Sequence, residues 1–346
     1  MSLAELPQVL IDPTAGPVLS LVEGADVLSR LLRDIRVSKC LQYCFEPYGD
    51  WVVDASPAPF RPPGSVSMHI VAEGNLWLEM DGQLVDIGSG DVLVFPRGKP
   101  HFFGSGIDGR LLSPGDDVPT PPWERIPTVK YEAPGPRARI LCGFIEARVL
   151  DFQPLLAGLP HVMMARTSID SRDWLAPAVQ RLIREVDQPS PGGMTIVSRL
   201  SEVVFIEMLR RQMLAAREHG GWLAALGNPV VFKALKVLHG RPEMAWTQQA
   251  LAEATGVSKT VLCQHFQQIL NMAPMRYLRD WKLYQASMDL TQTRDPIIKI
   301  AERAGYGTEA AFCRAFARRH GVPPARWRRN YQQQDFGCGT QTRTMP

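Results

Sequence analysis

Leu251-Ala-Glu-Ala-Thr-Gly256 recurs 49 residues later as Ile300-Ala-Glu-Arg-Ala-Gly305, and this repeated stretch decides the fold of the C-terminal third of the chain. One residue is inserted near Gly307, and beyond it the offset is a steady 50. The later pairs in this register are Leu262 with Phe312, Cys263 with Cys313, Gln264 with Arg314, Phe266 with Phe316, Pro274 with Pro324, Arg276 with Arg326, and Tyr277 with Trp327. Self-similarity of this length indicates a duplicated structural unit.

Each copy has the pattern of a helix-turn-helix unit. Gly256 and Gly305 are placed to supply the positive φ that ends a first helix. Ser258 and Thr308 then follow as N-caps of a second helix. That second helix carries two apolar residues at i and i+4 on its buried side, so its opposite face is turned outward.

The outward faces carry side chains that are able to reach base edges in a major groove. The predicted base-reading residues are Lys259, Thr260, Cys263 and Gln264 in the first copy, and Glu309, Ala310 and Arg314 in the second. A single helix over 275–290 is predicted to join the copies, which holds them about 34 Å apart, one turn of DNA. The predicted phosphate contacts are Ser258, Thr308, Lys282, Arg318, Arg319, Arg328 and Arg329.

The charge of the chain is divided unevenly. Residues 228–331 hold 16 Lys and Arg against 7 Asp and Glu, whereas residues 1–227 hold 21 against 27. A basic module joined to an acidic one is typical of a chain in which only one half meets a polyanion. A helical bundle with a merely solvated basic face is the alternative, and the duplicated turn glycines and caps favour double-stranded DNA as the partner.

The N-terminal region has the texture of a β-domain. Between 43 and 103, short apolar runs alternate with Gly and Pro, and Asp81-Gly82 separates the runs 76–80 and 84–87, which predicts a tight hairpin. A strand is expected at 92–95 and a last strand within 137–149, with an exposed loop over 104–136. A meander of this kind favours a barrel or a sandwich. Residues 1–40 are expected to form a helix or strand pair that packs on it.

Helical periodicity begins at Asp173 and resumes after 189–193, in a helix that runs to about Arg217. The apolar stripe over 196–214, which includes Leu200 and Val204, faces either the β-domain or a second copy of the chain. We expect homodimers through this helix because it carries more apolar surface than one face of a β-domain covers.

Residues 228–331 resemble the DNA-binding domain of the AraC/XylS transcription regulators. The residues that carry this resemblance are Leu251-Ala252, Gly256, Ser258, Leu262, Phe266, Pro274 and Tyr277-Leu278, followed by Ile300-Ala301, Gly305-Tyr306, Phe312, Arg314, Phe316, Gly321 and Pro324. Gln264 departs from the pattern, since the family usually has Arg there. Gln bonds adenine whereas Arg favours guanine, so the first half-site is expected to read a different base.

The run from Gly90 to His101 resembles the second motif of the cupin barrels, with glycine, proline, glycine and histidine in register. The first motif does not match: Ser67 stands at the usual glutamate, and Arg61 and Pro63 stand at the paired histidines. His69 is what remains, on the same strand face as Ser67. The region 43–205 thus resembles the cupin-like sensor found ahead of this DNA-binding module in some AraC-type proteins.

The expected effector pocket comprises His69, Trp77, Phe95 and His101. Two histidines with a carboxylate or a thiol suffice for zinc or iron, so His69 and His101 are the candidate metal ligands. A hydrogen-bonded pocket without metal is the alternative. No cofactor is required by this interpretation, and a divalent metal in the barrel stays open.

These observations predict an α+β protein with an N-terminal cupin-like β-barrel followed by helices and an all-α C-terminal domain with two helix-turn-helix units. The expected ranges are a sensor domain at 1–150, a helical linker and dimerisation segment at 151–227, the DNA-binding domain at 228–331 and a flexible tail at 332–346. The predicted function is effector-controlled, sequence-specific transcription regulation, with RNA polymerase as a possible partner.

No catalytic constellation is evident in the sequence, so we expect no enzyme activity. The alternative is a metal-dependent cupin enzyme that carries a DNA-binding tail. The six cysteines form no CxxC pair, no apolar run is long enough for a membrane helix, and the N-terminus has no basic signal region, so the cytoplasm is the expected location.

Overall fold

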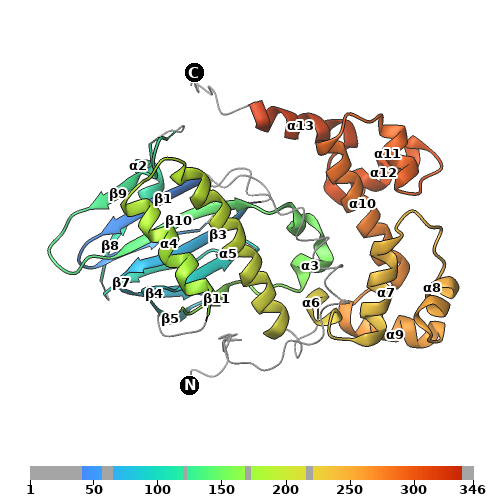
Figure 1. Ribbon diagram of the computed structural model, residues 1–346, viewed down its shortest axis with the longest axis horizontal. Helices are drawn as coiled ribbons and strands as arrows, with labels where there is room; N and C mark the ends of the chain where they lie inside the picture. The colour runs from blue at the N-terminus through green and yellow to red at the C-terminus, as the bar shows by residue number, and fades with distance from the viewer. Residues whose placement is uncertain are drawn as a thin grey trace. The chain divides into compact units, whose positions relative to one another are not determined.

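The computed structural model describes residues 41–56, 65–106, 108–119, 123–167, 173–215 and 221–336. The chain forms two compact units (Figure 1). Of the described residues, the first unit takes those up to Asp151 and those from Leu155 to Ala224, and the second takes Phe152–Pro154 and those from Ala225 onward. The helices that follow the sheets therefore group with the sheets, where the sequence predicted a separate segment over 151–227. The expectation for residues 1–40 lies outside the described residues.

The first unit is built on two sheets. The six-stranded sheet has the order β11 (Met163–Ala165), β6 (Val92–Phe95), β3 (Ser65–Glu73), β10 (Arg139–Glu146), β1 (Leu41–Pro47) and β9 (Thr128–Tyr131). The five-stranded sheet has the order β5 (Gln83–Gly88), β4 (Asn75–Met80), β7 (Phe102–Ser105), β2 (Trp51–Asp54) and β8 (Arg110–Leu112). Within the described ranges the two sheets are not joined into one closed barrel, which corrects the expectation of a barrel while keeping the cupin-like character of the fold.

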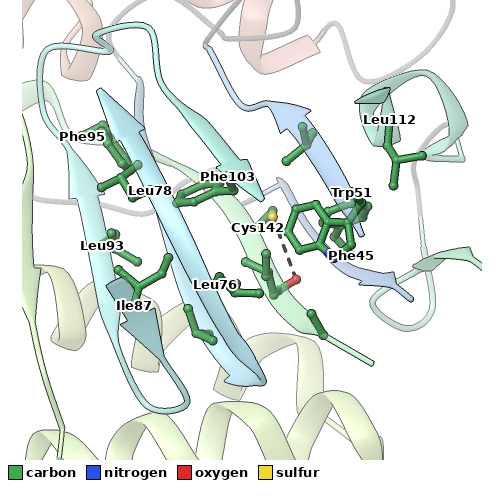
Figure 2. Close-up of a cluster of buried hydrophobic side chains, with 14 of the residues drawn as sticks. Phe45, Trp51, Leu76, Leu78, Ile87, Leu93, Phe95, Phe103, Leu112 and Cys142 are labelled. Atoms are coloured by element: carbon green, nitrogen blue, oxygen red, sulfur yellow. Dashed lines mark hydrogen bonds between the residues drawn. The ribbon is translucent and has the colours of Figure 1, made fainter. Parts of the chain in front are cut away.

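Apolar side chains fill the space between the sheets (Figure 2). Strand β4 shows how the sequence produces this core: Leu76, Leu78 and Met80 alternate inward because successive strand residues point to opposite faces. The predicted hairpin between β4 and β5 is confirmed, since Asp81 and Gly82 have φ of 58° and 74°.

Two expectations about the strands are wrong. The region 104–136 is not one loop, because β8, β9 and a short helix α2 (Pro114–Asp117) lie within it. Strand β10 is not the last, since it pairs with β1 and β3 inside the larger sheet and β11 follows it. Both misreadings arise where strands of three or four residues are too short to show a period.

Helices α4 (Leu175–Asp187) and α5 (Gly193–Ala215) lie across the six-stranded sheet (Figure 1). Ion pairs fix them: Asp187 at the end of α4 pairs with Arg139 of β10, and Arg211 of α5 pairs with Asp173 ahead of α4. Val204 is fully buried within this unit, so it does not belong to the free stripe expected from the sequence.

The second unit is all-helical. Its helices are α7 (Pro229–Gly240), α8 (Gln248–Thr255), α9 (Lys259–Leu270), α10 (Pro274–Gln292), α11 (Ile297–Arg303), α12 (Glu309–His320) and α13 (Pro324–Phe336). The long joining helix predicted at 275–290 is confirmed as α10. Helix α13 continues past residue 331, where the flexible tail was expected to begin, and residues 337–346 lie outside the described ranges.

Three short helical elements lie at the positions where the chain passes from one unit to the other. They are η1 (Arg148–Asp151), α3 (Gln153–Ala157) and α6 (Trp222–Ala225). Phe152, between η1 and α3, is fully buried in the second unit, where its ring contacts those of Tyr277, Trp281 and Tyr284 at centroid distances of 5.5, 5.3 and 5.6 Å. None of the helices in the described part of the chain is long and apolar enough to span a membrane.

Candidate nucleic-acid interface

The sequence repeat is also a repeat of burial. Leu251 and Ile300 are fully buried at matched positions, as are Leu262 and Phe312, and Phe266 and Phe316. The half-buried cysteines and the exposed N-caps also fall at matched positions in the two copies. Because each helix-turn-helix buries the same face, the residues left exposed on α9 and α12 occupy equivalent places.

The turn between the two helices of each unit has the geometry predicted for it. Gly256 and Gly305 have φ of 76° and 82°, the left-handed conformation that favours glycine. The amide of the next residue reaches back to the helix in both copies, from Val257 to the Ala252 carbonyl at 3.1 Å and from Tyr306 to Ala301 at 2.9 Å. These bonds end the first helix in the same way in each unit.

The second helix of each unit begins at a hydroxyl cap. Ser258 Oγ accepts from the amide of Val261, and Thr308 Oγ1 accepts from the amide of Ala311, both at 3.2 Å. The caps were predicted, and both residues are exposed. Their hydroxyl hydrogens are not used by these bonds, so a phosphate contact from either residue stays a prediction.

The predicted base-reading side chains lie on the outward faces. Cys263 is half-buried and the others are exposed, namely Lys259, Thr260 and Gln264 on α9, and Glu309, Ala310 and Arg314 on α12. No contact in the structure tests their role with DNA. Their exposure leaves them available for it.

Two of the predicted phosphate contacts, Arg328 and Lys282, are half-buried, and Arg328 has structural partners. The Arg328 guanidinium donates to the carbonyls of Leu290 at 3.1 Å and Asp295 at 2.6 Å, so it satisfies free carbonyls at the end of α10 and before α11. The Lys282 ammonium lies against Gly305, where a Cβ would meet it at 3.1 Å, and burial lowers its pKa. Arg318 and Arg329 are exposed, and Arg319 is half-buried.

Lys233 extends the repeat to the helix before each helix-turn-helix. Its Nζ donates to the Thr255 carbonyl at 3.1 Å, beside Gly256, just as Lys282 lies beside Gly305. The two lysines are 49 residues apart, the offset of the repeat, and each places a cation at the C-terminal end of a helix, where the dipole favours it. The offset was the signal that was available for finding this pair.

The interior of the first unit holds a small polar cluster. His69 and His101 are buried with ring centroids 5.7 Å apart, and His101 stacks on Phe95 at 3.6 Å. Both ring nitrogens of His69, Nε2 of His101 and Oγ of Ser67 have no hydrogen-bond partner among the described residues. Unpartnered polar atoms in an apolar interior are costly unless water or a ligand satisfies them.

Both imidazoles are neutral at pH 7. Burial lowers the pKa of His101 to about 4, and burial together with His101 lowers that of His69 well below its ordinary value. The carbonyl of Lys99 lies 2.8 Å from Nδ1 of His101, and a carbonyl only accepts, so Nδ1 carries the proton. The Nε2 of His101 is therefore a free acceptor.

The structure separates Trp77 from the other residues of the expected pocket. Its neighbours Leu76 and Leu78 face the core, whereas Trp77 lies on the opposite face of β4, against Gly104, and donates to the Gly106 carbonyl at 2.8 Å. His69, Phe95 and His101 do lie together.

The residues around the two histidines do not fit a complete metal site. Ser67 stands on the same strand face as His69, with its Oγ unpartnered, where a carboxylate ligand would be needed. No group of three or more His, Cys, Asp or Glu side chains in the described ranges is arranged to hold a metal ion. Two imidazoles alone fall short of the three or four protein ligands usual for zinc.

Comparison with known proteins agrees with this architecture. Residues 26–214 match a family model described as Cupin, and residues 251–330 match one described as Helix-turn-helix domain. The chain is 25% identical over 309 residues to the HTH-type transcriptional regulator AlkR of Acinetobacter baylyi. The aligned region covers 88% of this chain and 99% of that protein. A putative AraC-like transcription regulator of Streptomyces antibioticus is 28% identical over 317 residues, covering 88% and 99%.

A solved AraC-type regulator structure from Chromobacterium violaceum matches 32% of this chain and 97% of its own, with 23% identity and a TM-score of 0.30. The two family models and the relatives that match most of the chain, and not this structural similarity, therefore identify the family.

Proposed function

Because the chain belongs to the AraC-type transcription regulators that carry an N-terminal cupin domain, we propose that a small molecule bound in its first unit controls how its second unit binds a specific DNA sequence. The observation that carries the DNA-binding part is the position-by-position repeat of burial, which leaves two equivalent recognition faces exposed on α9 and α12.

Selection of DNA from a random duplex library by the full-length protein tests this proposal. A reproducible binding motif with two parts about one helical turn apart is the expected result. Affinity that is the same for every sequence would reduce the protein to a general DNA-binding protein. A genome-wide binding map then shows which genes lie beside the sites, and so which metabolites to test as effectors.

The effector part of the proposal rests on the polar cluster between the sheets. Ser67, His69 and His101 offer neutral donors and acceptors surrounded by apolar side chains, with no cation among them. An uncharged small molecule with a hydroxyl or amide hydrogen for Nε2 of His101 suits this chemistry. Such a molecule would raise the melting temperature of the wild type, and His101→Phe would abolish that increase while leaving binding to DNA intact.

We also propose that the chain forms homodimers through α5. Val203 is 41% exposed, and Ile196 and Leu200 are half-buried on the same side of the helix, at i, i+4 and i+7. These three residues belong to the stripe predicted over 196–214, whereas Val204 of that stripe is buried. We propose RNA polymerase as a further partner. We propose the cytoplasm as the location, because a bacterial-type regulator meets its DNA there.

We propose that the protein regulates transcription without catalysing a reaction. Relatives over most of the chain are named transcriptional regulators, and nothing in the comparisons supports the alternative of a metal-dependent enzyme. Substrate turnover by purified protein supplied with iron or zinc would revive that alternative.

A further inference from the structure

The first unit carries an open groove of about 570 Å³ at the open end of the β4–β5 hairpin. The start of β4 and the end of β5 line it, together with Ser105 and Gly106 at the end of β7 and Arg166 after β11. None of the residues of the polar cluster between the sheets lines this groove. It is therefore a separate feature of the same unit.

One wall of the groove is an aromatic ring held flat on the sheet. A Cβ at Gly104 would collide with three atoms of the Trp77 indole, so the ring packs directly on the backbone of β7 where a side chain is missing. The Nε1–H of Trp77 donates to the Gly106 carbonyl at 2.8 Å, which fixes the edge of the ring. Because one face of the ring lies against the backbone, its other face is turned to the groove.

A buried carboxylate lines the same groove. Asp91 is only 6% exposed, and its Oδ2 accepts from the amide of Gly88 at 2.9 Å. Its Oδ1 has no hydrogen-bond partner among the described residues. Burial raises the pKa of this carboxyl group. Removing a carboxylate from water is costly when one oxygen stays unpaired, and a cationic donor in the groove would offset that cost.

Acidic groups outnumber basic ones around the ring. Asp86 is exposed and stands opposite Trp77 in the register of the hairpin, so the two side chains are neighbours on one face. The carboxylate of Asp50 lies beside Gly106 at the other side of the ring. Among the described residues that line the groove, Arg166 is the one cation, and it donates to the carbonyl of Asp86 at 3.1 Å. With the buried carboxylate, three acidic groups stand against one guanidinium.

We propose that this groove binds a small organic cation, whose ammonium group lies over the Trp77 ring and donates to Asp86 and Asp91. The face of an indole attracts a cation through its quadrupole, and the carboxylates add charge-assisted hydrogen bonds. A primary ammonium has three donors and no acceptor, which suits two carboxylates and a ring face better than a neutral or anionic group does. This second ligand site depends neither on the cluster between the sheets nor on DNA binding.

Three probes of equal chain length test the charge of the ligand: butylamine, 1-butanol and butyrate. At pH 7 they are cationic, neutral and anionic. With full-length protein labelled with ¹⁵N at tryptophan, butylamine should shift the indole N–H signal of Trp77, which is assigned by its loss in Trp77→Leu. In calorimetric titrations 1-butanol should bind about 10-fold more weakly or less, because it lacks the charged hydrogen bonds, and butyrate should not bind.

Substitutions test the residues. Asp86→Asn should weaken butylamine binding about 2- to 5-fold, as for an exposed ion pair, and Asp91→Asn about 10-fold or more, because this carboxylate is buried. Trp77→Leu should weaken binding about 3-fold or more. Asp116→Asn is the matched control, since it makes the same exchange at an exposed carboxylate of α2 outside the groove, and it should change nothing. Melting temperatures show that each variant is folded.

Several results would overturn the proposal. Equal binding of butylamine and 1-butanol would mean that the groove takes only the apolar chain, and tighter binding of butyrate would mean that Arg166 determines the ligand. A wild type that does not bind butylamine, or equal weakening by Asp86→Asn and Asp116→Asn, would also refute it. His101→Phe should leave butylamine binding as it is; a loss of binding in this variant would place butylamine in the cluster between the sheets instead.

Discussion

Phe152 comes from the segment between the sheets and α4, yet its side chain belongs to the core of the DNA-binding unit. It is fully buried, and its ring makes edge or tilted contacts with Tyr277, Trp281 and Tyr284 of α10. Replacing a buried Phe with Ala typically costs about 3–5 kcal/mol through lost transfer energy and a cavity. Ring contacts, worth about 0.5–1.5 kcal/mol each beyond burial, place Phe152→Ala toward the upper part of that range.

Hydrogen–deuterium exchange of the full-length protein measures this loss separately in each unit. The slowest amides of α10 report opening of the second unit, and those of β4 report opening of the first. Phe152→Ala should speed exchange in α10 about 100-fold or more, since each 1.4 kcal/mol corresponds to a factor of about 10, and should lower DNA affinity with it. Exchange in β4 should change little.

Phe103→Ala is the matched control, because Phe103 is equally buried but lies between the sheets. It should speed exchange in β4 and spare α10. If Phe152→Ala instead affected β4 as Phe103→Ala does, and left α10 unchanged, then Phe152 would contribute its packing energy to the first unit and the reasoning above would be refuted.

Three other outcomes follow from the contacts described. Folding lowers the pKa of His101 from 6.5 to about 4, so below pH 6.5 the unfolded chain binds more protons than the folded one. The free energy of unfolding of the first unit should therefore fall by up to about 3 kcal/mol between pH 6.5 and pH 4. His101→Gln should reduce that fall, as measured by urea titrations at each pH. Val203→Glu should convert dimers to monomers in light scattering, whereas Leu84→Glu, at a residue 60% exposed on β5, should not; a dimer in both variants would argue against α5 as the interface. Arg328→Ala should lower the melting temperature of the second unit, because it removes two hydrogen bonds to backbone carbonyls. The slope of log DNA affinity against log salt concentration should stay the same as for Arg125→Ala, a control at an exposed arginine of the first unit.

The sequence predicted the second unit in more detail than the first because each of its turns depends on a residue type that few others replace. Glycine at 256 and 305 and hydroxyl caps at 258 and 308 signal backbone geometry directly, and the repeat showed each signal twice. The strands of the first unit have no such marks. Strand β8 has only three residues, too few to show alternation, and its position in the sheet comes from a parallel pairing with the distant β2.

Sequence also placed charged residues on the correct helices without showing where their side chains end. Lys282 and Arg328 both lie in a basic module, which favoured phosphate contacts for both. The Arg328 side chain, however, donates to backbone carbonyls at the end of α10 and before α11, whereas Lys282 lies half-buried against the turn at Gly305. Trp77 lies between Leu76 and Leu78, so strand alternation already places it on the face opposite to the core, a signal that the prediction of an effector pocket did not use.

The one-residue insertion in the repeat explains why two copies with different spacing keep the same recognition face. Gly307 is the extra residue, and it is exposed with open space where a side chain would stand. It follows the capping bond from Tyr306 to Ala301 and precedes the cap at Thr308, so neither bond is displaced. The additional length is thus taken up between these two bonds. The register of α12 against its core is set by the buried Phe312 and Phe316, as that of α9 is by Leu262 and Phe266, and not by the turn. Deletion of Gly307 should therefore leave Phe312 buried and Arg314 exposed while straining only the turn, which loss of second-unit stability with retained base preference at the α12 half-site would verify. A changed base preference would mean that the turn sets the orientation of the recognition helix.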